Sequence, residues 1–258
     1  MNYRYQIKPF QTGGEKSVHL GTCVESGLDV VLKFPLLPYT AAGRAGFVVE
    51  VRRTLRVQAL GGESVTAVLD YNLAVEPPFF VEAYYPDGTL AKLIADLAGR
   101  KQVFRDDFAL NFARQILVAL SNVHESGQIH RDVKPSNVFY TRSDHKLVLG
   151  DFGIGRTLNR PTVVQTRAFK GTRGYASPEQ ELGGRLGGVD HRTDLYAVGV
   201  ILHEMLTGKR GGWDAITYRG QPAISAILDG LLAFDRDDRY RSANSAIRAI
   251  DGTRLAHR

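Results

Sequence analysis

Cysteine is nearly missing from this sequence, and long apolar runs are wholly missing. Cys23 is the only cysteine among 258 residues, so an intramolecular disulfide is impossible and a cysteine-based zinc site is not expected. No window reaches the roughly 18 apolar residues that a membrane-spanning helix needs. The N-terminal stretch MNYRYQIKPF also lacks the apolar core of a signal peptide. We therefore expect a cytoplasmic chain with no membrane partner.

Long basic runs are absent too, although the formal net charge is +6 at pH 7. Charge-driven nucleic-acid binding uses clustered lysine and arginine, often interleaved with aromatic residues. No stretch of the chain shows that pattern, so we expect no nucleic-acid partner. The composition, 43% hydrophobic with 23% charged residues, is that of a globular chain with a large core in one or two domains.

The first third of the chain predicts a small antiparallel sheet with one helix. The β-rich runs VHLGTCVE and LDVVLKF are separated by Ser26-Gly27, which predicts a hairpin. Within 45–60, Phe47 and Val51 recur at helical spacing. Two further strands are predicted in SVTAVLDY and PFFVEAYY.

The remainder is predicted to be mostly helical. One helix begins at Asp106 or Asp107, which can cap it, and ends at Gly127. The run DLYAVGVILHEMLTG is apolar around most of its circumference, as in a buried central helix. Two more helices are predicted around AISAILDGLLAF and SANSAIRAIDG. The predicted fold class is α+β, with strands in 1–84 and helices in 85–258.

Polar residues with catalytic chemistry occur at close spacing in the segment HRDVKPSNVFYTRSDHKLVLGDFG. Asp132 can accept a proton from an attacking hydroxyl, and Lys134 can neutralise a phosphate. Asn137 and Asp151 offer the oxygen ligands that magnesium favours. The segment therefore predicts a phosphoryl-transfer site.

This segment resembles the catalytic loop and metal-binding DFG segment of eukaryotic-type (Hanks-type) serine/threonine protein kinases, with similarity to bacterial members. The resemblance covers nearly all of the chain. It implies a bilobal protein-kinase fold over 1–258, using ATP and Mg²⁺ (or Mn²⁺) to phosphorylate protein substrates. Asp132 would be the base, Lys134 is typical of Ser/Thr-directed members, and Asn137 and Asp151 would hold metal. His130 resembles a structural histidine that packs against the DFG segment.

The resemblance also implies a lysine for the nucleotide phosphates in the N-terminal part. Lys33 ends the apolar run VVLK, where family members hold the α- and β-phosphates. Glu50, in FVVEVRR, is the matching candidate for the glutamate that braces this lysine.

The nucleotide pocket departs from the family pattern. In QTGGEKSV, the three glycine positions of the phosphate loop are occupied by Gln11, Gly13 and Lys16, with Gly14 and Val18 beside them. Only the middle glycine is retained, so backbone amides have less freedom to approach phosphates, although Lys16 can contribute charge directly.

The positions expected around adenine depart as well. Val31 stands at the lid in place of alanine, and Phe139 stands at the floor in place of leucine. Counting back from Leu90 makes Glu82 the gatekeeper and Ala83 to Tyr85 the hinge. A slip of one residue would make Val81 the gatekeeper instead, and both registers stay open at this point.

The segment 151–179 resembles an activation segment and ends in Ser177-Pro178-Glu179. We expect Glu179 to pair with Arg239, Asp194 to anchor the catalytic-loop backbone, and Thr172 to contact the catalytic residues. Arg131 carries a positive charge that could pair with a phosphate on the activation loop. Thr162 and Thr166 are candidate autophosphorylation sites, Thr166 being the better placed; ordinary polar loop residues are the alternative.

Two other functions compete with a protein kinase. The degenerate phosphate loop and the bulky adenine-pocket residues favour a pseudokinase, a nucleotide-binding or scaffolding module with little transfer activity. A kinase-fold enzyme acting on a small molecule is the third candidate. Lys134, Thr172 and the complete activation segment argue for a protein substrate instead.

Overall fold

The computed structural model describes residues 5–7, 12–13, 16–36, 38, 40–152, 156–157, 174–182, 188–211 and 218–255. The chain divides into two compact units, Met1–Pro86 (unit 1) and Asp87–Arg258 (unit 2). This boundary lies two residues after the one expected from the sequence. The following expected functional positions lie outside the described residues: Gln11, Gly14, Thr162, Thr166 and Thr172.

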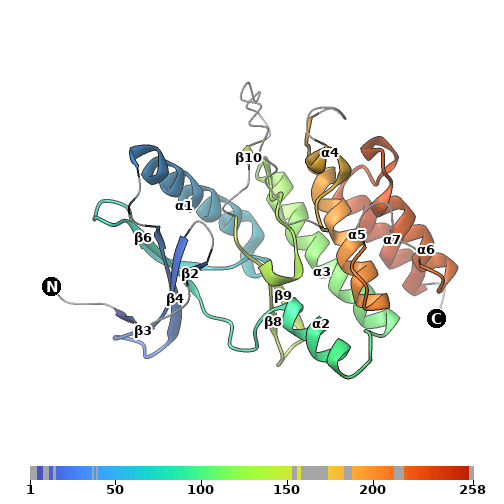
Figure 1. The fold of residues 1–258 in the computed structure, drawn as a ribbon, viewed down its shortest axis with the longest axis horizontal. Helices are drawn as coiled ribbons and strands as arrows, with labels where there is room; N and C mark the ends of the chain where they lie inside the picture. Colours follow the sequence, from blue (N-terminus) through green and yellow to red (C-terminus); the bar gives the residue numbers. More distant parts are fainter. Residues whose placement is uncertain are drawn as a thin grey trace. The chain divides into compact units, whose positions relative to one another are not determined.

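Unit 1 is built on one antiparallel sheet with a single long helix beside it (Figure 1). Along the sheet the strands run β1 (Tyr5–Ile7), β3 (Lys16–Cys23), β4 (Asp29–Pro35), β6 (Phe79–Ala83) and β5 (Val68–Asn72), and β2 (Thr12–Gly13) also pairs with β3. The predicted hairpin is confirmed, because β3 and β4 pair through a turn at Gly27, whose φ is +70°. Glycine adopts such a left-handed backbone at no steric cost.

The helix α1 (Ala41–Gly61) covers one face of this sheet. It begins at Thr40, whose hydroxyl accepts a hydrogen bond from the N–H of Gly43 at 3.1 Å. Its residues Phe47 and Val51 pack against Phe80 of β6 in a buried cluster. The opposite face carries its own cluster of Val30, Leu32 and Val81, packed with Tyr5, Phe34 and Phe79.

Unit 2 is mostly helical, in agreement with the predicted α+β fold. Its helices are α2 (Leu90–Gly99), α3 (Asp106–Glu125), α4 (Pro178–Glu181), α5 (Arg192–Thr207), α6 (Pro222–Leu232) and α7 (Ala243–Leu255). Two small sheets join β7 (Gln128–Ile129) to β10 (Arg156–Thr157) and β8 (Val138–Thr141) to β9 (Lys146–Leu149). The helix α2 was not separately predicted from the sequence.

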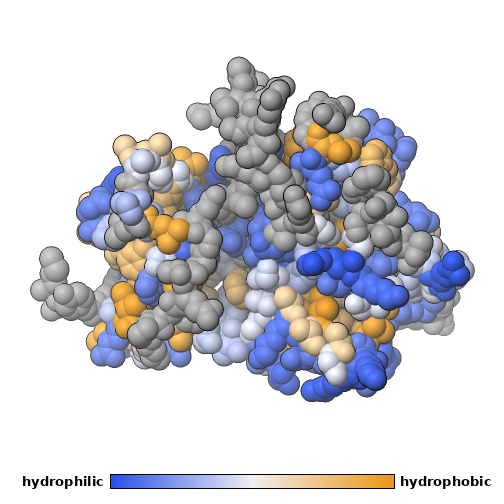
Figure 2. All heavy atoms as spheres, in the orientation of Figure 1, coloured by the Kyte–Doolittle hydropathy of each residue, from blue (hydrophilic) through white to orange (hydrophobic). Residues whose placement is uncertain are grey.

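The helix α5 is the centre of unit 2, packing against both α3 and α6. Its side chains are buried on nearly all sides, as its apolar sequence predicted, and it ends at Gly208, whose φ is +69°. No helix in the described ranges combines the length and apolarity required to cross a bilayer. On the face shown in Figure 2, hydrophobic residues lie in small groups among hydrophilic ones.

Gly199 allows α5 and α6 to approach closely, which gives a test of the packing. A Cβ built there would lie 2.7 Å from Cγ of Leu232 and 2.9 Å from Cβ of Leu231, so Gly199→Ala should overpack this contact. We expect a net loss of stability on the order of 1 kcal/mol, since overpacking costs about 1–3 kcal/mol and exceeds the helix-propensity gain of about 1 kcal/mol. Urea unfolding measures the difference.

Gly252 provides the matched control for this substitution. It lies in α7 and a Cβ there meets nothing within 4 Å, so Gly252→Ala should stabilise the protein by up to about 1 kcal/mol through helix propensity. Equal effects of the two substitutions would contradict a close α5–α6 contact at Gly199.

Candidate active site

A buried carboxylate at the start of α5 holds the loop that carries the candidate catalytic residues. Asp194 is fully buried, and its two oxygens accept hydrogen bonds from the backbone N–H groups of His130 and Arg131, at 2.9 and 2.8 Å. Arg131 has a φ of +69°, a left-handed conformation that is strained for a residue with a side chain. The expected anchoring by Asp194 is confirmed, and it holds the backbone in this bend.

His130 fixes the other side of the same loop. Its Nε2 lies 3.0 Å from the carbonyl oxygen of Gly150, and its ring centroid lies 5.1 Å from that of Phe152. The ring is buried. The prediction that His130 packs against the DFG segment is therefore confirmed.

Three of the expected catalytic side chains converge within the loop. Lys134 Nζ donates to Oδ2 of Asp132 at 2.7 Å, and Asn137 Nδ2 donates to the same oxygen at 3.2 Å. Asn137 Nδ2 also donates to the Asp132 carbonyl at 2.9 Å. Since both side-chain donors reach Oδ2, they fix the rotation of the carboxylate and make its two oxygens inequivalent.

Asp151 follows this loop through a short backbone connection. The N–H of Gly150 donates to the carbonyl of Asn137 at 2.9 Å, which brings Asp151 next to the asparagine. Asp151 itself has a φ of +62° and is partly exposed. Asn137 uses its amide nitrogen on Asp132, so its Oδ1 is the atom it can offer to a cation. An amide oxygen and a carboxylate are donors that suit magnesium.

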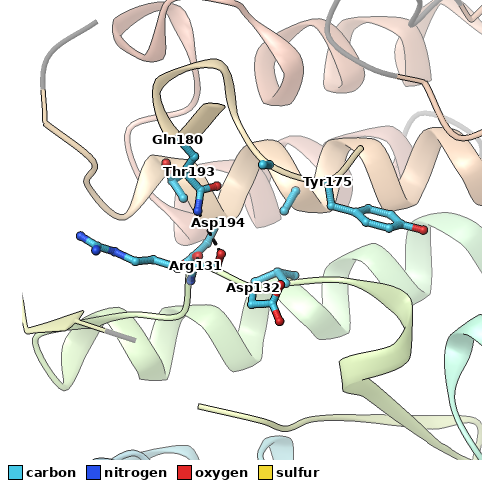
Figure 3. A pocket seen from close by; sticks show the side chains of 9 residues that line it. Arg131, Asp132, Tyr175, Gln180, Thr193 and Asp194 are labelled. Carbon is cyan, nitrogen blue, oxygen red and sulfur yellow. Dashed lines mark hydrogen bonds between the residues drawn. The ribbon is translucent and has the colours of Figure 1, made fainter. Parts of the chain in front are cut away.

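A small pocket of unit 2 adjoins Asp132 (Figure 3). It is lined by residues of the catalytic loop, of the end of the activation segment and of α5, namely Arg131, Asp132, Val133, Tyr175, Ala176, Gln180, Thr193, Asp194 and Ala197. In Figure 3, Arg131 and Asp132 are consecutive but point in different directions. The pocket thus lies where the catalytic loop meets the end of the segment that resembles an activation segment.

Gln180 ties these two segments together. Its Nε2 donates to the carbonyl of Arg131 at 2.9 Å, while its Oε1 accepts from the N–H of Ser177 at 3.2 Å. Ser177 and Gln180 form a capping box at the start of α4. Gln180 was not predicted from the sequence, although Ser177 followed by Gln180 three residues later is a recognisable helix-start signal.

The predicted pair of Glu179 and Arg239 is confirmed. Both oxygens of the carboxylate accept from the guanidinium at 2.8 Å, and the two side chains are almost completely buried. Burial alone would raise the pKa of Glu179, but hydrogen bonds from Arg239 and Thr193 hold it below its ordinary value.

Tyr175 was not predicted from the sequence either. Its hydroxyl donates to Glu204 of α5 at 2.5 Å, and its ring lies 5.3 Å from the Arg210 guanidinium. Burial, together with the Glu204 carboxylate, raises the pKa of Tyr175 well above its usual range. The phenol is thereby kept as a hydrogen-bond donor.

In unit 1 the expected pair of Lys33 with Glu50 is not formed. Lys33 Nζ lies 2.7 Å from Oε2 of Glu82, whereas Glu50 pairs with Lys16. The sheet explains the difference: Glu82 lies opposite Val31 on the neighbouring strand, two residues along from Lys33 and on the same face. Such diagonal cross-strand neighbours are within reach of long side chains.

The remaining positions expected around the nucleotide are distributed over both units. Val18 lies directly opposite Lys33 in the sheet, and Val31 is half-buried on the same face. The backbone of Gly13 belongs to β2. Ala83 ends β6 and donates its N–H to the Ala67 carbonyl at 3.0 Å.

Tyr85 and Phe139, which are also expected around the nucleotide, are both partly buried. Tyr85 lies in unit 1, where burial and the Glu82 carboxylate raise its pKa. Phe139 lies on β8 of unit 2 and forms an isolated bridge with Thr89. Glu82 lies on the Lys33 face of the sheet, and Val81 points into the opposite cluster.

Comparison with known proteins agrees with the family resemblance of the sequence motifs. Residues 48–241 match the protein kinase domain family. The serine/threonine-protein kinase PknL of Mycobacterium tuberculosis is 31% identical over 241 residues, covering 90% of this chain and 58% of that protein. PknB of Mycolicibacterium smegmatis is 34% identical over 260 residues, covering 90% and 40%. PrkC of Bacillus subtilis is 29% identical over 234 residues, covering 89% and 33%. This chain thus spans less than two thirds of each relative.

The ionised Asp194 should make stability depend on pH. Burial alone would raise the pKa of this carboxyl, but the hydrogen bond and charge of His124 at 2.8 Å, and the Arg131 N–H, hold it below its ordinary value. The unfolded state, with a pKa of about 3.9, therefore binds more protons in acid. The contribution of Asp194 to stability is therefore complete above about pH 5, and it is lost as the pH falls through the unfolded pKa and then the lower native pKa.

Asp194→Asn tests this dependence. It should lower the free energy of unfolding at pH 7 by on the order of 3 kcal/mol, since it weakens two charge-assisted backbone hydrogen bonds. It should also flatten the decline in stability between about pH 5 and 3, measured by urea unfolding. Asp96→Asn, at an exposed position of α2, is the control. An equally steep decline in Asp194→Asn and wild type would show that Asp194 does not carry this dependence.

Proposed function

The chain belongs to the protein kinase family, as its motifs predicted, and from this we propose that it transfers the γ-phosphoryl group of ATP to serine and threonine hydroxyls of proteins. The observation that carries the proposal is the convergence of Lys134 and Asn137 on one oxygen of Asp132. That arrangement orients a base beside a phosphate-neutralising cation, which are the parts that phosphoryl transfer requires. The names of the three relatives support the same reaction.

Asp132 acts as the base in this proposal. The substrate hydroxyl oxygen attacks the γ-phosphorus, its proton passes to the Asp132 carboxylate, and the bond from phosphorus to the β–γ bridging oxygen breaks to release ADP. Lys134 offsets the negative charge that develops on the transferred group. Asp194 contributes by holding the loop backbone, so it positions Asp132 without touching the reacting atoms.

Asn137 and Asp151 would hold the divalent cation, for which Mg²⁺ is the first choice and Mn²⁺ the second. Family members use a divalent metal with ATP, and the oxygen donors of these two side chains fit either ion. When bound, such an ion neutralises charge on the phosphates.

Unit 1 supplies most of the nucleotide contacts in this proposal. Lys33 and Lys16 would bind phosphate oxygens, and Glu82 would be the gatekeeper because it lies on the Lys33 face. The backbone of Ala83 to Tyr85 would form the hinge. Val18 and Val31 would contact adenine, as would Phe139 of unit 2, and Gln11, Gly13 and Gly14 are the residues expected in the phosphate loop.

Catalysis is favoured over the pseudokinase alternative. The candidate catalytic residues Asp132, Lys134, Asn137 and Asp151 are all present, and the relatives bear the names of serine/threonine protein kinases. A protein substrate is favoured over a small molecule by Lys134, by Thr172 and by the activation segment that ends in Ser177-Pro178-Glu179. Cytoplasmic location stays a prediction.

A phosphate-transfer assay with labelled ATP and a generic protein substrate tests the activity. Wild type should label the substrate, and Asp132→Asn should reduce the rate at least 100-fold, because a general base contributes about 10²–10⁴-fold. Lys33→Met should also be strongly impaired, while Asp96→Asn serves as a surface control. Equal labelling by all variants would contradict the site assignment. Thermal stabilisation by MgATP without any transfer would instead favour the pseudokinase.

We further propose that the chain phosphorylates its own activation segment at Thr166, Thr162 or both. Arg131 precedes the base and carries a charge that a phosphothreonine can satisfy. Mass spectrometry after incubation with MgATP should find phosphate on these threonines in wild type and none in Asp132→Asn. Unmodified threonines in a preparation that phosphorylates other proteins would contradict this proposal.

A further inference from the structure

Two lysine–glutamate pairs lie in unit 1 beside the face of the sheet that α1 covers. Lys33 pairs with Glu82 at 2.7 Å, and Lys16 pairs with Glu50. All four side chains are no more than 13% exposed. Burial makes the choice of partner important, because a buried charge that loses its partner is strongly destabilising.

The sheet itself holds Glu82 beside Lys33. The two residues lie on neighbouring strands, β6 and β4, whose register sets Val31 opposite Glu82 and Phe80 opposite Lys33. The lysine Nζ is 5.6 Å from the centroid of the Phe80 ring, which is itself buried under α1. Because both partners are on strands joined by ladder hydrogen bonds, this pair is independent of the position of the helix.

Glu50 has a different partner on the same face. It projects from α1 to Lys16, at the start of β3. Lys16 is two residues before Val18, which lies opposite Lys33, so the two lysines are diagonal neighbours on adjacent strands. The phosphate-loop lysine is therefore braced by the helix, and the strand lysine is braced by the sheet.

We propose that Glu82 is the positioning residue of Lys33, in the place that the family pattern gives to Glu50, and that Glu50 positions Lys16 as a second cation for the nucleotide phosphates. This inference rests on the proposed function. An ammonium group has three N–H donors, so Lys33 can donate to Glu82 and to a phosphate oxygen together. Holding the ammonium in place reduces the conformational freedom lost when the nucleotide binds.

A competing role for Glu82 predicts the opposite effect of neutralising it. If its carboxylate only competed with phosphates for Lys33, Glu82→Gln would release the lysine and tighten nucleotide binding. If Glu82 positions the lysine, the same substitution weakens binding. The direction of change therefore distinguishes the two roles.

The pairing is tested first without nucleotide, by urea unfolding of double-mutant cycles. Lys33→Met and Glu82→Gln should be non-additive, with the double variant less destabilised than the sum of the singles, because each single change leaves a buried charge unpaired. Lys33→Met and Glu50→Gln should be additive. Coupling of Lys33 to Glu50 and not to Glu82 would overturn the proposal.

Calorimetric titration with MgATP then tests positioning. Glu82→Gln should weaken binding about tenfold or more, since the ion pair that holds the ammonium becomes a weaker hydrogen bond to a neutral amide. Glu82→Asp should bind with intermediate affinity, and Lys16→Met and Glu50→Gln should be non-additive. Unchanged or tighter binding by Glu82→Gln would overturn the proposal.

Two further outcomes separate this proposal from the proposed function. If wild type did not bind MgATP, the proposed function and the positioning role would both be overturned, while the unfolding cycle would still report which residues pair. If Glu82→Gln did not fold, Glu82→Asp would decide alone. Its weaker binding would support the positioning role, and binding equal to wild type would overturn it.

Discussion

The candidate active site of unit 2 depends on one buried carboxylate. Asp194 accepts the N–H groups of two consecutive loop residues, and without these bonds the left-handed backbone at Arg131 would lack its stabilising partner. The bend that follows brings the Asp132 carbonyl and carboxylate within reach of Asn137. Asn137 in turn accepts the N–H of Gly150, which places Asp151. Each link is a hydrogen bond between buried or half-buried groups, so a loss at Asp194 would propagate to both candidate metal ligands.

The buried charges of unit 1 are stabilised differently from that of Asp194. The carboxylates of Glu82 and Glu50 are paired with lysines, and the partners are set by strand register for Glu82 and by the helix for Glu50. A strand pair is held by the hydrogen-bond ladder, whereas a helix residue can change partner if the helix shifts. The sheet therefore provides the more rigid support for the lysine proposed to contact the nucleotide.

Local signals in the sequence predicted most of the fold. Helical periodicity located α1, an apolar run located α5, and the Ser26-Gly27 turn located the β3–β4 hairpin, because these signals depend on residues close in the chain. The loop anchored by Asp194 was also predicted, through its resemblance to a family. The partner of Lys33 was not, since it depends on a register between strands separated by more than 40 residues. The partner of Lys33 is Glu82, a diagonal neighbour on the adjacent strand, and no pattern of residues close in the chain identifies that neighbour.

The buried pair also changes how a substitution of Lys33 should be interpreted. Replacing a phosphate-binding lysine with methionine is intended to remove one contact with the nucleotide. In this chain it also leaves Glu82, which is 3% exposed, without its cation. An unpaired carboxylate in such a place costs several kcal/mol, so lost activity in Lys33→Met combines a missing phosphate contact with a weakened sheet. The double variant Lys33→Met/Glu82→Gln removes both charges and so leaves no unpaired carboxylate. The activity that this double variant lacks relative to wild type is the part that can be attributed to the lost phosphate contact.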